Sequence, residues 1–351
     1  MSKKILTGVV LMALLAASVS MTGCGSGPAA GTINLTDPVK GISCTGEDSQ
    51  AVKLHSLSEQ LFSDTWAACG ENGNFLMSPL SLLEVLGMIS EGAGGQTRQQ
   101  LEDFFGYSTN EVSQYMRYLE NNLPSEKDAK LKIANSILFL INAICFDAKW
   151  EEPYEKGAVF ESEFYPEGGG ISEASYMRSE EYGYVVDENT TGFVRPYKNG
   201  YSFVALLPEE GLTMAEYLAG FDGSKLENLL AEKKDETVFC TLPKFSGETS
   251  MKLMDMLSSK GVTDLFNPDQ ADLTPMADLN GESLYVSRII QKTFIEVDEQ
   301  GTRAAAITMA AAEGAAEPMN VVNLNRPFVY AIVEDASQLP VFLGVVMNPA
   351  E

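Results

Sequence analysis

Six long apolar runs after residue 130 constrain the fold of this chain more than any other feature of its sequence. They are rich in β-branched and aromatic residues, which favour strands. Three helical patterns, at 213–218, 224–232 and 250–260, interrupt them. Such a mixture predicts an α+β fold built on large sheets. The apolar runs are 133–146, 203–207, 238–242, 284–297, 328–334 and 341–347.

The composition limits what such a fold can do. Of the 351 residues, 45% are hydrophobic, which is enough for a packed core and excludes a disordered chain. The 49 acidic residues outnumber the 24 basic ones, and the net charge of −25 repels phosphate backbones and anionic lipid headgroups. No repeat or hydrophilic linker divides residues 51–351, so we predict one domain there and no nucleic-acid partner.

Catalytic and metal chemistry have little support in the sequence. His55, in the region before the first helix, is the single histidine, which argues against Ser/His or Cys/His catalytic pairs. Ser78 has no Gly-x-Ser-x-Gly sequence around it, and Asp269 and Asp272 lack the glycine and terminal glutamate of a calcium loop. We therefore expect a protein that is not an enzyme and that has no cofactor and no metal ion.

The first 23 residues have the pattern of an export signal. An apolar stretch at 5–19 follows two lysines, and small residues then lead to Cys24. This ending resembles the lipobox of bacterial lipoproteins, in which Cys24 would be lipidated and would attach the protein to a membrane. Met21 stands where leucine is usual, so simple secretion is the alternative. Residues 24–50, rich in Gly, Ser, Thr and Pro, predict a flexible tether, and the expected location is extracellular.

Four further cysteines lie far apart and form no CxxC pair. Cys145 and Cys240 lie inside apolar runs, so we predict buried thiols there. Export would permit disulfides, and pairing among Cys44, Cys69 and these two stays open.

Two helices are predicted near the start of the domain. Ser78 and Pro79 have the pattern of an N-cap followed by proline in the first turn, and Gly92 ends the helical spacing. Thr97 and Gln100 have the spacing of a capping box, which predicts the start of a second helix.

The segment 301–317, with the sequence GTRAAAITMAAAEGAAE, contains almost nothing that could anchor a core. Composition alone predicts an alanine-rich helix or a loose surface loop. Side chains alternate along a strand, however, and as a strand this segment would separate small residues from large or charged ones. It could therefore exist as an exposed loop and also insert between strands. One face would hold Thr302, Ala304, Ala306, Thr308, Ala310 and Ala312, and the other Arg303, Ile307, Met309 and Glu313.

Motifs along nearly all of residues 50–351 resemble those of the serpin family, in the family's order. The helix B signature, with its Asn-x-x-x-Ser-Pro-x-Ser core, is similar to NGNFLMSPLSLLEVLGMISEGAGGQT at 72–97. The central strand motif is similar to LINAICFDAKWEEPYE at 140–155. Later blocks are similar to TLPKFSGETSMKLMDMLSSKGVTDLFNPDQADLTPM at 241–276 and to LYVSRIIQKTFIEVDEQGTRAAAIT at 284–308, and the closing strands to NRPFVYAIVED and VFLGVVMNP.

The resemblance implies a serpin fold with a large central β-sheet, smaller sheets, helices and an exposed reactive loop. It also implies an inhibitor of serine-type endopeptidases that acts as a suicide substrate, in which the cleaved loop inserts into the large sheet before the acyl-enzyme is hydrolysed. The family spacing from Gly301 places the reactive bond at Ala315–Ala316, and the spacing counted back from Pro327 shifts it by one residue. Alanine before the bond favours elastase-like or subtilisin-like proteases as partners.

Two supporting regions follow from the same resemblance. The hinge would comprise Glu299, Gly301, Thr302, Ala304, Ala305 and Ala306, where small uncharged residues favour insertion, although Arg303 replaces the usual acidic residue. The shutter beneath the sheet would comprise Ser78, Ser81, Asn142 and Gln291. Glutamine replaces the family's histidine at position 291, and its amide can both donate and accept hydrogen bonds.

Several dozen residues of the family pattern are missing between residues 140 and 141. They would form a helix, an edge strand of the main sheet and the helix across that sheet, and their loss would create a new edge. The alternative function is therefore a non-inhibitory serpin-fold binding protein, or a truncated, inactive serpin, that proteases cleave only as a substrate.

Overall fold

The structure is a computed structural model of the chain. It describes residues 48–69, 73–124, 129–134, 140–198, 200–276, 284–302 and 320–350, all within one compact unit, Cys44–Glu351. For residues 48–53, 120, 129–134, 140–145, 156 and 302 it describes the backbone alone.

Nine of the described strands form the larger of two sheets, in the order β1-β14-β13-β7-β6-β5-β8-β12, with β4 paired to β5. Strands β7, β13 and β14 are buried at every position. Their sequences are continuous apolar runs because a strand covered on both faces has no solvent side. The nine strands are β1 (Phe75–Met77), β4 (Val159–Phe164), β5 (Ser172–Val186), β6 (Thr190–Pro196), β7 (Tyr201–Pro208), β8 (Lys234–Pro243), β12 (Val321–Asn323), β13 (Phe328–Glu334) and β14 (Pro340–Val346).

The smaller sheet contains the hinge residues Gly301 and Thr302 and two of the shutter residues, Asn142 and Gln291. Among the described residues it has five strands, in the order β11-β3-β10-β9 with β2 paired to β3. Strands β3 and β10 are parallel, whereas β2, β9 and β11 each run antiparallel to their neighbour. Among the described strands, the sheet that the resemblance implies to be the large central one is thus the smaller of the two. Its strands are β2 (Ala129–Ala134), β3 (Leu140–Lys149), β9 (Phe245–Lys252), β10 (Ile289–Val297) and β11 (Gly301–Thr302).

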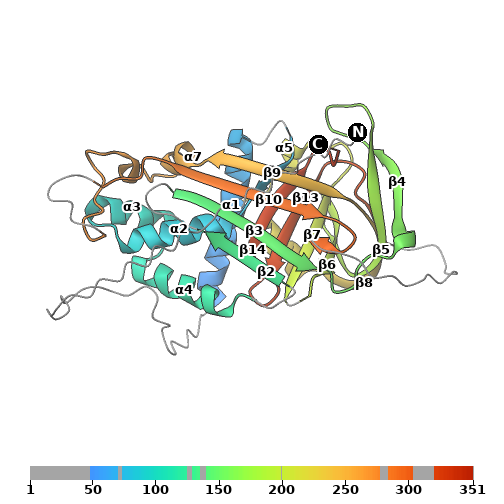
Figure 1. The fold of residues 1–351 in the computed structure, drawn as a ribbon, viewed down its shortest axis with the longest axis horizontal. Coiled ribbons are helices and arrows are strands. Elements are labelled where there is room, and N and C mark those ends of the chain that lie inside the picture. Colours follow the sequence, from blue (N-terminus) through green and yellow to red (C-terminus); the bar gives the residue numbers. More distant parts are fainter. Residues whose placement is uncertain are drawn as a thin grey trace, which may run out of the picture. The chain divides into compact units, whose positions relative to one another are not determined.

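The smaller sheet lies across one face of the larger one (Figure 1). The ring of Phe146 on β3 contacts Tyr201 of β7 and Phe342 of β14, with centroids 5.2 and 6.2 Å apart. Phe245 of β9 lies 5.1 Å from Tyr330 of β13. Aromatic side chains from both sheets therefore fill the layer between them and fix the smaller sheet in place.

The helices pack around this pair of sheets, and α2, α3 and α4 gather at one end of them (Figure 1). As predicted, Ser78 caps α2, where its Oγ accepts a hydrogen bond from the Ser81 N–H, and Gly92 follows the last turn. The helices are α1 (Asp48–Cys69), α2 (Pro79–Glu91), α3 (Gly95–Phe105), α4 (Thr109–Asn122), α5 (Met214–Leu218), α6 (Lys225–Ala231) and α7 (Met254–Ser259), with 3₁₀ turns η1 (Lys156–Ala158) and η2 (Asp264–Phe266).

Three expectations about helices are wrong. Helix α3 begins at Gly95, and Thr97 lies inside its first turn, where Thr97 Oγ1 accepts a hydrogen bond from the Asp272 N–H at 3.0 Å. The threonine therefore binds a distant loop instead of capping its own helix. His55 lies within α1 and is buried, not ahead of the first helix. Residues 250–252, predicted as helical, belong to β9.

Candidate functional site

The side-chain amide of Gln291 joins β10 to Ser78, the N-cap residue of α2. Gln291 is fully buried. Its Oε1 accepts a hydrogen bond from the Ser78 N–H at 2.9 Å, and its Nε2 donates to the Ser78 carbonyl at 2.8 Å. Ser78 Oγ donates in turn to the Val341 carbonyl of β14 at 2.7 Å. Ser78 therefore connects the smaller sheet, the start of α2 and the larger sheet.

The other two predicted shutter residues lie close to this pair. Ser81 is buried in the first turn of α2, with its N–H bound to Ser78 Oγ. Asn142 lies directly opposite Gln291 in the ladder between β3 and β10. The structure thus brings the four predicted positions together, with Asn142 placed by its backbone.

A tight turn connects β10 to β11. The carboxylate of Asp298 accepts hydrogen bonds from the N–H groups of Gln300 and Gly301, at 2.8 and 3.2 Å. Beside it, the carboxylate of Glu299 forms an ion pair with Lys244 at 2.5 Å. This contact lowers the pKa of Glu299 below its usual value, so its charge is retained at neutral pH.

Gly301 occupies a position that no other residue could take without a shift of the backbone. Its φ of +143° lies in a region that L side chains rarely adopt. A Cβ atom there would lie 2.2 Å from the Ala148 carbonyl oxygen of β3. The backbone of the hinge at Gly301 therefore lies directly against the backbone of β3, with no room for a side chain between them.

The segment that follows β3 holds the turn through three hydrogen bonds. The Trp150 N–H donates to the Gln300 carbonyl at 3.1 Å, and the Trp150 indole Nε1 donates to the Asp298 carbonyl at 2.8 Å. The Tyr154 N–H donates to the Glu299 carbonyl at 2.9 Å. Trp150 is itself buried and stacks on Tyr197, with ring centroids 4.3 Å apart.

The hinge and β10 share one edge of β3. Ala148 pairs with Ala129 of β2 and also with Thr302 of β11, so β2 and β11 lie on opposite edges. Strand β10 pairs with residues 140–145, some of which also pair with β2, and it therefore lies on the same edge as β11. The β10 ladder ends at Cys145 and the β11 ladder begins at Ala148, which leaves positions 146 and 147 of this edge between the two ladders.

Several predicted residues lie outside the described residues. They are Cys24, Cys44, the hinge alanines Ala304, Ala305 and Ala306, and the reactive-bond residues Ala315 and Ala316. The side chain of Cys145, predicted as a buried thiol, also lies outside what the structure describes. The buried thiol predicted at Cys240 is confirmed, and Cys240 and Cys69 are both free. Across the described ranges, no group of three or more His, Cys, Asp and Glu side chains is placed to hold a metal ion, and no helix is long and apolar enough to cross a membrane.

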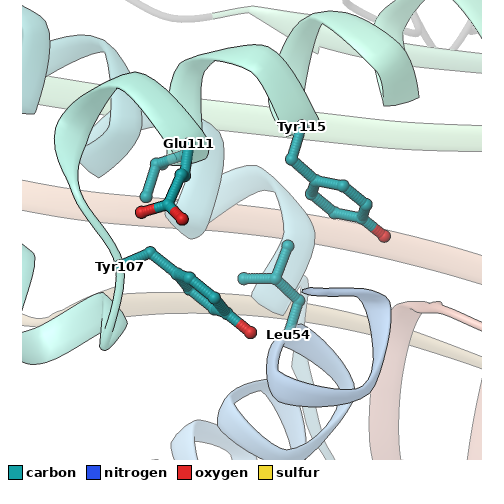
Figure 2. Close-up of a pocket in the computed structure, with 5 residues that line it drawn as sticks. Leu54, Tyr107, Glu111 and Tyr115 are labelled. Carbon is teal, nitrogen blue, oxygen red and sulfur yellow. The ribbon is translucent and has the colours of Figure 1, made fainter. Parts of the chain in front are cut away.

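A small pocket lies between α1 and α4. Figure 2 shows Leu54 of α1 facing Tyr107, Glu111 and Tyr115. The cavity measures about 10 Å³, which is room for roughly one water molecule. A second cavity, between α4 and the end of β13, measures about 80 Å³. Both are far smaller than the roughly 300–1,000 Å³ of ligand pockets, so the hinge region is the candidate functional site.

Sequence reasoning missed the groups that hold the hinge. The serpin-like motifs at 140–155 and 241–276 contain Trp150, Tyr154 and Lys244, but nothing in the sequence pairs these residues with 298–300. The indole of Trp150 binds a residue 148 positions away. Only the folded sheet brings these residues together.

The comparisons with known proteins agree with this architecture. The family model described as "Serpin (serine protease inhibitor)" matches residues 54–139 and 135–349. An alpha-1-antitrypsin homolog of Cyprinus carpio is 31% identical over 62% of this chain and 58% of its own length. The plasma serine protease inhibitor of Homo sapiens is 33% identical over 62% of this chain and 53% of its own length. The chain thus spans little more than half the length of these relatives.

Solved structures share the fold. The native state of tengpin, a thermophilic serpin, superimposes with a TM-score of 0.80 at 32% identity, over 86% of this chain and 95% of that one. The predicted α+β serpin fold is thereby confirmed. The family match covers most of the domain, and the chain belongs to the serpin family.

Proposed function

We propose that this protein inhibits serine proteases as a suicide substrate, with elastase-like or subtilisin-like enzymes as targets. The protease serine would attack the carbonyl carbon of Ala315, the Ala315–Ala316 peptide bond would break, and the amine of Ala316 would leave with the serine's proton. The cleaved loop would then insert as a strand beside β3 before water hydrolyses the acyl-enzyme ester.

The register of β11 on β3 is the observation that carries this proposal. The pairs Gly301–Lys149 and Thr302–Ala148 already place the first hinge residues on the edge that an inserted strand would occupy. Continued in the same register, positions 303 and 304 would pair with 147 and 146, the part of this edge that β10 does not occupy. From position 305 onward, the inserted strand would replace the six pairs between β3 and β10 and would form ladders on both of its own edges. Insertion therefore adds backbone hydrogen bonds overall.

The small residues of the loop fit this register. Residues paired across antiparallel strands share a face of the sheet, so position 302 falls on the face of Ala148 and position 304 on that of Phe146. Both partners are buried. A threonine and an alanine at these positions meet the need for small uncharged side chains against the core.

We propose that Gln291 and Ser78 keep β10 attached to α2 while β3 and β10 separate. Their two hydrogen bonds join β10 to a helix start and not to β3, so opening of the sheet does not require them to break. Asn142, opposite Gln291 on β3, would lose its neighbour when the strand inserts.

The alternative is a serpin-fold binding protein that proteases cleave without being trapped. The family model matches in two stretches that meet at residues 135–139, which supports a missing block at this point of the chain. Among the described strands, β2 pairs only with β3, so the sheet is short on this side.

We propose that export and lipidation at Cys24 place either form outside the cell.

Incubation with elastase tests the proposal. A covalent complex that survives denaturing electrophoresis supports inhibition, whereas cleavage near Ala315 without a complex supports the alternative. Subtilisin, chymotrypsin and trypsin complete the panel. The variant Ala315→Arg is the matched control, because it should transfer complex formation from elastase to trypsin while the hinge stays unchanged.

A further inference from the structure

Arg195 of β6 is a buried cation that contacts the segment 150–154, and the proposed mechanism does not use it. The residue is 5% exposed, and its guanidinium forms an ion pair with Glu181 of β5, itself 6% exposed. A buried ion pair is often no more stabilising than apolar residues of the same volume. Stability alone therefore does not account for a charge at this position.

The guanidinium contacts the segment 150–154 at three points. It donates a hydrogen bond to the Glu152 carbonyl, lies 3.8 Å from the centre of the Tyr154 ring and lies 4.9 Å from that of Trp150. The planar cation can satisfy a carboxylate, a carbonyl and two ring faces at once, which a point charge such as lysine cannot do.

The same segment has little regular structure of its own. After Trp150, the backbone leaves β3 and runs as a bend and an irregular stretch. Its further backbone contacts to the end of β6 and to the residue after it are the hydrogen bond from Glu151 N–H to Pro196 O at 3.0 Å and the bridge between Trp150 and Tyr197. Its position therefore depends strongly on the side chain that packs beneath it.

We propose that Arg195 and Glu181 are positioning residues that hold Trp150–Tyr154 in the place from which this segment binds the hinge. Arg195 contacts Trp150 and Tyr154, which supply the three hydrogen-bond donors to residues 298–300. Loss of the cation releases the segment, and the hinge then leaves the end of β3 more often. This inference rests on the proposed function and deepens it, since it identifies the residues that hold the hinge at the end of β3 before insertion.

The experiment compares hydrogen exchange of the hinge in the whole protein and its variants, without any protease. The double variant Arg195→Leu/Glu181→Leu removes both charges, so neither is left buried without a partner and the fold is retained. We expect amide exchange in 150–154 and 298–302 to become roughly tenfold faster or more, because contacts to a buried cation are lost. Global melting should change little.

A second ion pair provides the matched control. Lys225 of α6 pairs with Asp187 and lies 5.7 Å from the Tyr217 ring, so it is also an ion pair beside an aromatic ring, but it does not contact the hinge segment. Lys225→Leu/Asp187→Leu should leave hinge exchange unchanged. Arg195→Lys keeps the charge opposite Glu181 and loses the planar contacts, and it should also accelerate hinge exchange.

Parental exchange rates in both Arg195 variants would overturn the positioning role. Equal acceleration in the Lys225/Asp187 control would overturn it as well, because the effect would then be general. The result is separable from inhibition. Faster hinge exchange in a protein that never traps elastase would refute the proposed function and leave the positioning role intact.

Discussion

Replacement of Gly301 by alanine tests whether the hinge must lie against the end of β3. The added Cβ would meet the Ala148 carbonyl oxygen at 2.2 Å and the Lys149 Cα at 2.6 Å, and both are backbone atoms that cannot rotate away. The clash can be relieved only if β11 moves off β3. We expect Gly301→Ala to detach the hinge while the rest of the fold stays intact.

The cost has two parts. Alanine at a φ of +143° adds backbone strain of about 1–3 kcal/mol. Detachment of β11 also removes the hydrogen bonds of two ladder pairs, and at a net ~0.5–1.5 kcal/mol each this adds about 1–3 kcal/mol. The second part is specific to the hinge. It corresponds to roughly 5- to 150-fold faster exchange of the hinge amides.

Gly211→Ala separates the two parts. Gly211 has a φ of +97° and nothing within 4 Å of its added Cβ, so this variant carries backbone strain without a clash. Exchange of residues 298–302 should accelerate in Gly301→Ala and stay at the parental rate in Gly211→Ala. Equal hinge exchange in the two variants would mean that the close approach to β3 does not hold the hinge.

Four further predictions concern other parts of the chain. Thr302→Arg places a charge on the buried face of the inserted strand, which is costly without a partner, so the protein should become a substrate that elastase cleaves near Ala315 without a trapped complex on a denaturing gel. Burial raises the pKa of Glu59 from 4.5 to about 7, so the folded protein holds a proton that the unfolded chain has lost, and the free energy of unfolding falls as the pH rises through this window. Denaturant titrations should therefore find Glu59→Gln more stable than the parent by up to about 3 kcal/mol at pH 8 and similar to it at pH 4. Cleavage in the loop should raise the melting temperature because the inserted strand adds a ladder, and equal melts of cut and uncut protein would favour the alternative function. Mass spectrometry of the mature N-terminus should find a lipid on Cys24, and an unmodified terminus at another residue would exclude the anchor but not export.

Local signals were sufficient for part of the fold. Ser78, Pro79 and Gly92 mark the ends of α2 through their own backbone preferences, and these ends are where the structure places them. The apolar runs located β7, β13 and β14 because strands buried on both faces need no polar positions.

Predictions failed where a distant partner decides the local structure. The spacing of Thr97 and Gln100 is that of a cap, but Asp272 binds the threonine and Gly94 takes the cap position. Helix α1 was missed although Leu54, Leu61 and Phe62 are buried at helical spacing along it. That signal was present in the sequence, whereas the contact with Asp272 was not.

The candidate site shows the same division. The resemblance identified Ser78 and Gln291, but the amide geometry that joins them depends on how β10 lies over α2. Arg195 looks like a surface residue in the sequence, since arginine is rarely buried without a partner. Its partner Glu181 lies on the neighbouring strand β5. The backbone carbonyl that Arg195 also binds lies on the segment after β3, and nothing in the sequence links these positions.

The register of the hinge also offers a physical explanation for Arg303, which stands where the serpin family usually has an acidic residue. Continuation of the β11 ladder by one residue would place position 303 opposite Asp147, which is exposed. Opposite charges across neighbouring strands contribute only roughly 0.2–1 kcal/mol, far less than a full ladder of backbone hydrogen bonds. This pair therefore cannot drive insertion as a whole. In the proposed insertion it would act on the first step, when the strand would enter positions 147 and 146 of an edge that β10 does not occupy and no ladder pair would yet be broken. An acidic residue at 303 would meet Asp147 as a like charge at that step, so in this chain a basic residue would suit the proposed insertion better than the acidic residue that is usual in the family.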